Sequence, residues 1–227
     1  MSGVYPYCIV EAGCHPPPGL TGLGGRPVEG RDVEPFTIWT SAEARAPALD
    51  LEGIRRHHEV VRAASESVTP LPVRFGGWAR DHSVLADRIR RRRGELEAAL
   101  TAVFGCVELG VTLEHASAEP ESGVSGETPA GGRAYLRELS HVYAERRRRR
   151  AERDAMVERL RAALMELTTD ERVRYLRPPG LVSVAHLVAR DHEARYRDSV
   201  AAFASEHDQV ARVLVTGPWP PYSFAGS

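Results

Sequence analysis

Apolar and polar positions along the first 80 residues predict two strands followed by a helix. The strand candidates are short runs rich in aromatic and β-branched residues, at 5–11 and 35–40. The residues between them, 13–31, contain many Gly and Pro residues and predict a loop. Apolar residues then recur at helical spacing over 50–67. Pro70 ends this helix, because proline disfavours α geometry in the residue before it.

The rest of the chain predicts one more helix and then an alternation of strands and helices. The helix is expected over 82–103, with Asp81 or Ser83 as its N-cap. A low-complexity connection follows later, over 116–132. The pattern after residue 105 indicates strand, helix, strand, strand, helix and strand, at 106–114, 133–167, 173–176, 181–187, 191–205 and 210–216. This order is the split βαβ arrangement of a ferredoxin-like fold.

These elements predict an α+β protein of two domains, and a length of 227 residues is enough to bury a core in each. The N-terminal α+β domain is expected over 1–80 and the ferredoxin-like domain, with its long helix, over 106–216. A bridging helix over 81–105 joins them, and residues 217–227 form a C-terminal tail.

Composition excludes several classes of protein. The formal net charge is −1, so no overall field attracts the protein to nucleic acid or to an anionic membrane. No stretch approaches the ~20 apolar residues of a membrane helix, and the first residues do not read as a secretory signal. The 3 cysteines are sparsely spaced, which favours a reducing cytoplasm over a disulfide framework.

Few residues suggest catalytic or metal chemistry. His57, His58 and Glu59 lie on a predicted helix but lack the second histidine of a zinc protease motif. The cysteines have no Cys-x-x-Cys spacing, and the glycine cluster at 20–25 lacks the Gly-Lys-Ser/Thr of a P-loop. We therefore predict no catalytic residue, cofactor or metal. A small-molecule-binding module or enzyme on a ferredoxin-like scaffold stays the alternative, and it would need a pocket with converging polar groups.

A run of arginines is the most prominent charged feature. Residues 145–161 hold eight arginines and four acidic residues, and every basic residue of the chain is Arg. Apolar residues at both ends of this helix are expected to pack on a sheet while the Arg-rich middle projects. The projecting part is either a solvated helix, a docking surface for an acidic protein, or an RNA-binding surface. RNA binding would favour paired aromatics on the sheet, whereas Tyr175 is alone. The candidate partner-binding residues are Arg146, Arg147, Arg149 and Arg150.

The C-terminal tail combines three prolines with aromatic residues, in the sequence GPWPPYSF over 217–224. Proline lacks the N–H that a sheet needs, so we expect this segment to be stiff, polyproline-like and unable to extend a strand. Burying an aromatic side chain is worth ~1.5–3 kcal/mol. The tail is therefore expected to pack between the two domains through Trp219, Tyr222 and Phe224. An exposed tail that anchors a partner is the alternative.

Five segments, in order, give the chain a resemblance to the GvpL/GvpF family of gas vesicle proteins. They are YCIVEA (7–12), His58-Glu59 with TPLPVRFG (69–76), VELGVTL (107–113), GRAYL (132–136) and GPWPPYSF (217–224). The resemblance implies two α+β domains, the second a modified ferredoxin-like fold, with the tail between them. It implies a non-enzymatic accessory role in assembling gas vesicles in the cytoplasm. The implied partners are the shell protein GvpA and other accessory gas vesicle proteins.

Overall fold

The computed structural model describes residues 3–115, 132–176 and 181–226, apart from the side chains of residues 132, 134, 135 and 138. The chain divides into two compact units, one of residues 1–108 with 218–227 and one of residues 109–217. Each unit contains a four-stranded sheet, so the mixed α+β composition is confirmed. The domain boundaries predicted above stay predictions. Residues 116–131 of the predicted low-complexity connection lie outside the described residues.

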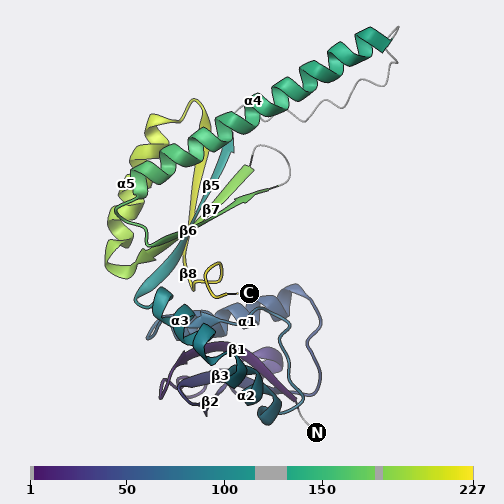
Figure 1. The fold of residues 1–227 in the computed structure, drawn as a ribbon. Helices are drawn as coiled ribbons and strands as arrows, with labels where there is room; N and C mark the ends of the chain where they lie inside the picture. The colour runs from purple at the N-terminus through teal and green to yellow at the C-terminus, as the bar shows by residue number, and fades with distance from the viewer. Residues whose placement is uncertain (1–2, 116–131, 177–180, 227) are drawn as a thin grey trace. The chain divides into compact units, whose positions relative to one another are not determined.

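The sheet of the first unit has the strand order β2-β3-β1-β4 (Figure 1). The four strands are β1 (Gly3–Glu11), β2 (Glu29–Val33), β3 (Phe36–Glu43) and β4 (Leu71–Pro72). β1 lies between β3 and β4 and is antiparallel to both, which explains why all but its last residue are buried. The strands predicted at 5–11 and 35–40 are confirmed. The prediction of a loop up to residue 31 is wrong at its end, because β2 is a polar, mostly exposed edge strand without apolar alternation.

The helix expected over 50–67 is α1 (Leu51–Ser65). The Asp50 carboxylate accepts a hydrogen bond of 2.7 Å from the Gly53 N–H and so caps its first turn. One face of α1 is buried, through His57, Val60, Val61 and Ala64. The three apolar residues among these belong to the same core cluster as Tyr5, Tyr7 and Trp39 of the sheet.

The helix expected over 82–103 is divided into α2 (His82–Arg91) and α3 (Arg93–Val103). Asp81 is the N-cap of α2, since its carboxylate accepts a hydrogen bond of 2.8 Å from the Val84 N–H. The chain leaves helical geometry at Arg92, where φ is −105° and ψ is 13°. Gly94 follows this break, and glycine in a helix costs about 1 kcal/mol relative to alanine. Apolar spacing alone did not reveal the break.

The second unit begins within β5 (Cys106–His115) and ends within β8 (Ala211–Trp219). Between them lie α4 (Gly132–Leu164), β6 (Asp170–Tyr175), β7 (Leu181–Ala189), a short 3-10 turn (Arg190–His192) and α5 (Glu193–Glu206). The strand order is β6-β7-β5-β8, and β6 is antiparallel to β7. Both helices pack on the same side of this sheet (Figure 1). The six elements predicted after residue 105 are thus all present.

A chain of polar contacts joins the two helices to the sheet in this unit. The guanidinium of Arg161 on α4 lies 2.6 Å from the carboxylate of Glu171 on β6. That carboxylate lies 3.2 Å from Nε2 of His186 on β7, and His186 Nδ1 lies 2.6 Å from the Tyr196 hydroxyl on α5. Burial lowers the pKa of His186, so the ring is neutral at pH 7 and hydrogen bonds to both neighbours without carrying a buried charge.

Helix α4 is longer than the sheet that it covers. Its 33 residues extend about 50 Å, whereas a strand of 10 residues such as β5 spans about 34 Å. The C-terminal part packs on the sheet through buried Met156, Leu160 and Leu164, and the N-terminal part extends past it (Figure 1). The prediction that both ends of the helix pack on a sheet is therefore wrong. No described helix is apolar enough over a sufficient length to cross a membrane.

Strand β8 is longer than predicted, because it continues through Gly217 and Pro218 to Trp219. The expectation that the proline-rich segment cannot extend a strand is wrong at its first residues. β8 is an edge strand of its sheet, where a residue without an N–H can point that side to the open edge. Regular strand structure ends before Pro220 and Pro221.

His57 is buried at the centre of the first unit. Its side chain is 2% exposed, and its Nδ1 lies 2.8 Å from the hydroxyl of Tyr5. Burial lowers the pKa of His57 to about 4, so the ring is neutral at pH 7. From the sequence, His57 and His58 are expected to be a surface or domain-interface pair, whereas the structure places His57 in the core of the first unit.

Acidification is expected to destabilise the protein through His57. In the unfolded chain His57 has a pKa of about 6.5, whereas in the folded protein its pKa is about 4. Between these two pH values only the unfolded chain binds the proton. The free energy of unfolding therefore falls as pH falls through this range. At pH 5 this loss is about 2 kcal/mol relative to pH 7.5. We expect the His57→Gln variant to lose about 2 kcal/mol less than the wild type over this range in urea denaturation. Equal losses in both proteins would exclude this linkage.

Candidate partner-binding surface

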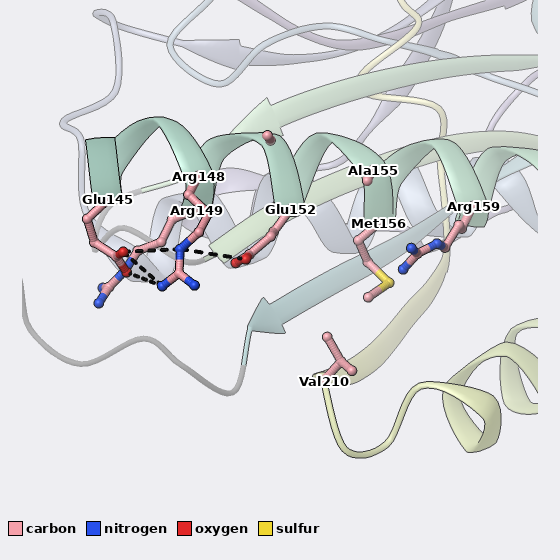
Figure 2. Close-up of a pocket in the computed structure, with 9 residues that line it drawn as sticks. Glu145, Arg148, Arg149, Glu152, Ala155, Met156, Arg159 and Val210 are labelled. Atoms are coloured by element: carbon pink, nitrogen blue, oxygen red, sulfur yellow. Dashed lines mark hydrogen bonds and ion pairs between the residues drawn. The ribbon is translucent and has the colours of Figure 1, made fainter. Parts of the chain in front are cut away.

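A groove lies beside the arginine run of α4 in the second unit (Figure 2). Its volume is about 520 Å³. Most of its lining comes from one face of the helix, where residues spaced three and four apart stand in line. The opposite wall is Val210, in the turn before β8. The lining residues are Glu145, Arg148, Arg149, Ala151, Glu152, Ala155, Met156, Arg159 and Val210.

The charged end of the groove is organised by Glu145. Its carboxylate lies 2.8 Å from the guanidinium of Arg148 and 2.8 Å from that of Arg149. These two hydrogen-bonded arginines lower the pKa of Glu145 to about 2, so it is ionised at any physiological pH. Arg148 also lies 4.0 Å from Glu152 (Figure 2). Ion pairs of this exposed kind fix side-chain positions more than they stabilise the fold.

The other end of the groove is apolar. Met156 is buried and Val210 is 39% exposed, and the two face each other across the groove (Figure 2). Ala151 and Ala155 contribute only methyl groups, which leaves room above the helix. Arg159 completes this end and has no ion-pair partner among the described residues. A ligand here would meet an apolar floor with three arginines and two glutamates around it.

The structure separates the four predicted arginines into two groups. Arg149 lines the groove, whereas Arg146, Arg147 and Arg150 are exposed residues outside its lining. Arg150 lies 3.9 Å from Asp154. Sequence reasoning omitted Arg148 and Arg159, although spacings of three and four from Glu145 onward place both on the groove face. It also omitted Val210, for which the helix sequence contains no signal.

The residues with possible reactive chemistry do not gather at this groove. No three His, Cys, Asp or Glu side chains among the described residues are placed to hold a metal ion. Cys8 and Cys106 are buried, and burial raises the pKa of the Cys8 thiol, which opposes thiolate formation. The groove itself combines ion-paired charges with an apolar end.

The aromatic tail packs within the first unit. Tyr222 lies against the core cluster that contains Tyr5, Tyr7 and Trp39, and Phe224 is 8% exposed. Trp219 is 39% exposed and contacts the His58 ring edge-on, with 5.4 Å between ring centroids. The tail thus buries much of its aromatic surface against its own unit. Its predicted packing between two domains stays a prediction.

Two hydrogen bonds hold the tail at Ser223. The backbone N–H of Ser223 donates to one carboxylate oxygen of Glu108 at 2.7 Å, and its hydroxyl donates to the other at 2.8 Å. The hydroxyl of Tyr222, in contrast, is buried without a hydrogen-bond partner among the described residues. Burial also raises the pKa of Tyr222, so this hydroxyl stays protonated.

Comparisons with known proteins agree on one group. The family model described as "Gas vesicle synthesis protein GvpL/GvpF" matches residues 3–226. The chain is 31% identical to gas vesicle protein L of Streptomyces sp. (strain CB03234), covering 92% of this chain and 87% of that protein. It is 27% identical to gas vesicle protein L2 of Halobacterium salinarum, covering 98% and 91%. Its fold matches the crystal structure of GvpF from Anabaena sp. PCC7120 with a TM-score of 0.81 at 17% identity, covering 100% and 99%.

Truncating the tail side chains is expected to destabilise the first unit in proportion to their burial. Tyr222→Ala should lose about 2–3 kcal/mol because it leaves a cavity against the core. Trp219→Ala should lose about 1 kcal/mol, since part of that ring already contacts solvent. Tyr222→Phe removes only the unpartnered hydroxyl and should leave stability unchanged or slightly raised. Urea denaturation at pH 7.5 measures all three. A large loss for Tyr222→Phe would show that the hydroxyl has a partner.

Proposed function

Because this chain belongs to the GvpL/GvpF family of gas vesicle synthesis proteins, we propose that it supports gas vesicle assembly by binding the shell protein GvpA and other accessory gas vesicle proteins. In this proposal it acts at the gas vesicle and its assembly sites in the cytoplasm. The observation that carries the proposal is the part of α4 that extends past its sheet with exposed arginines.

The physical need for such a protein follows from the shell. A shell subunit with a surface apolar enough to face gas exposes that surface before assembly, and large exposed apolar patches aggregate. A partner that covers the patch, or that pairs with a free strand of the subunit, would keep it in solution. The partner must also release the subunit, which favours a surface of charges and limited apolar area.

The projecting part of α4 has these properties. Arg146, Arg147 and Arg150 are exposed, and arginine makes forked hydrogen bonds to carboxylates. Leu136 and Tyr143 on the preceding turns are 63% and 57% exposed. Apolar side chains next to arginines at helical spacing form a surface suited to an acidic protein segment with apolar anchors. The groove around Arg149 lies on the same helix and overlaps the arginine run, since its lining extends from Glu145 to Arg159.

We also propose that the second unit is a ferredoxin-like domain. Its order of strand, helix, strand, strand, helix and strand, with the sheet order β6-β7-β5-β8, supports this assignment. This topology carries no function by itself. We propose no catalytic activity, because the charged groups in the α4 groove pair largely with each other.

Reversing the charge of the arginine run should disrupt partner binding without unfolding the protein. We expect Arg146, Arg147, Arg149 and Arg150 changed together to Glu to lower co-purification of GvpA or an accessory gas vesicle protein at least about tenfold. The matched control changes four exposed arginines elsewhere to Glu, namely Arg45, Arg62, Arg91 and Arg195. Thermal melting checks that both variants fold.

Three results would contradict parts of this proposal. Unchanged binding by the α4 variant would exclude this surface. Equal loss in the control would show an effect of net charge alone. Failure of the wild-type protein to associate with any gas vesicle protein would refute the proposed function itself.

A further inference from the structure

The sheet of the second unit has one face that its helices leave uncovered. Contacts from α4 to Glu171 and from α5 to His186 place these two residues on the covered face. Side chains alternate along a strand, so Arg172 and Arg174 of β6, with their cross-strand partners Ala185 and Ser183 of β7, point to the other face. No described helix of this unit packs there (Figure 1).

The remaining two strands contribute to the same open face. Leu109, Val111 and Leu113 of β5 are buried toward the helices, so alternation leaves Glu108, Gly110, Thr112 and Glu114 on the open side. A Cβ added to Gly110 would lie 2.6 Å from the Thr216 hydroxyl oxygen, so Thr216 of β8 stands on this side too. Alternation along β8 then adds two exposed residues, Arg212 and Leu214.

The chemistry of this face differs between its centre and its edges. At mid-sheet the central strands present Gly110, Thr112, Ser183 and Ala185, none larger than threonine and none charged. Toward the two ends of β5 stand Glu108, which accepts hydrogen bonds from Ser223, and the exposed Glu114. The edge strands carry arginines. Arg172 is already paired with Asp170 at 2.6 Å. Within the part of the chain that the structure describes, the two remaining arginines have no ion-pair partner, namely Arg174 on β6 and Arg212 on β8.

The width of this sheet face matches the width of an α-helix. Neighbouring strands lie about 4.8 Å apart, so the edge strands of this four-stranded sheet are about 14 Å apart. An α-helix with its side chains is about 10–12 Å wide. A helix laid over β5 and β7 would fit between the edge arginines, and the small central side chains let its backbone approach closely. Leu214, which is 55% exposed, would contact its apolar stripe.

We propose that this open face binds an amphipathic α-helix of another gas vesicle protein, with an apolar stripe of small residues on β5 and β7 and acidic side chains toward Arg174 and Arg212. This inference rests on the proposed function for the source of the helix. It assigns a second surface, on the opposite side of the sheet from α4. RNA fits this face less well, because RNA-binding sheets of this topology stack bases on central-strand aromatics, and the four central positions hold none.

Site-specific photocrosslinking tests the proposal in the full chain. A benzoylphenylalanine residue replaces Ala185 at the centre of the face, and a second protein carries it at Arg195, an exposed residue on α5. Both are co-produced with the gas vesicle proteins, irradiated and mapped by mass spectrometry. We expect position 185, and not position 195, to crosslink to a segment that is helical and rich in Glu or Asp. A crosslink to nucleic acid, to a strand or to a basic segment would overturn the proposal, as would no crosslink from a folded protein.

Charge reversal gives an independent measurement on an exposed side chain. Arg174→Glu should weaken binding of the crosslinked segment, as a synthetic peptide, about 5- to 10-fold, and the effect should shrink as salt rises. Arg195→Glu, which changes the net charge equally, should leave binding unchanged. Equal affinity for the wild type and Arg174→Glu would overturn the proposal. If the wild-type protein still associates with gas vesicle proteins in that case, only this face is excluded and the proposed function stands.

Discussion

The length of α4 relative to its sheet determines which part of this helix packs on strands and which part extends past them. A helix of 33 residues cannot be covered by strands of 6 to 10 residues, because a strand rises only about twice as far per residue. The apolar residues of its C-terminal part, such as Leu160 and Leu164, therefore pack against the sheet, and the arginine run 146–150 precedes them along the helix. Leu136 and Tyr143 stay exposed for the same reason. Charge and apolar surface are thus presented together on one rigid element.

Each unit buries a tyrosine–histidine pair, and both pairs are compatible with an apolar core because burial keeps the imidazole neutral. His57 with Tyr5 anchors α1 to the first sheet, and His186 with Tyr196 anchors α5 to the second. In the second unit Glu171 and Arg161 extend the contact to α4. Directional hydrogen bonds of this kind fix the orientation of a helix more strictly than apolar packing alone.

The two candidate surfaces of the second unit have different chemistry. The α4 groove holds acids and arginines that already pair with each other, as Glu145 does with Arg148 and Arg149. A partner there must compete with existing ion pairs, which favours weak and reversible binding. The open sheet face instead offers small side chains at its centre and arginines at its edges. The two surfaces are therefore suited to segments of different chemistry.

The sequence by itself determined the family, the order of nearly all helices and strands, and the arginine run, because each depends on local spacing or on short motifs such as GPWPPYSF. It did not reveal β2, whose polar residues lack alternation, or the break at Arg92. Only the tertiary structure placed His57 in the core, Val210 opposite Met156 and Thr216 beside Gly110. These contacts join residues that are distant in sequence. They depend on strand order and packing, which leave no periodic pattern of apolar residues along the chain.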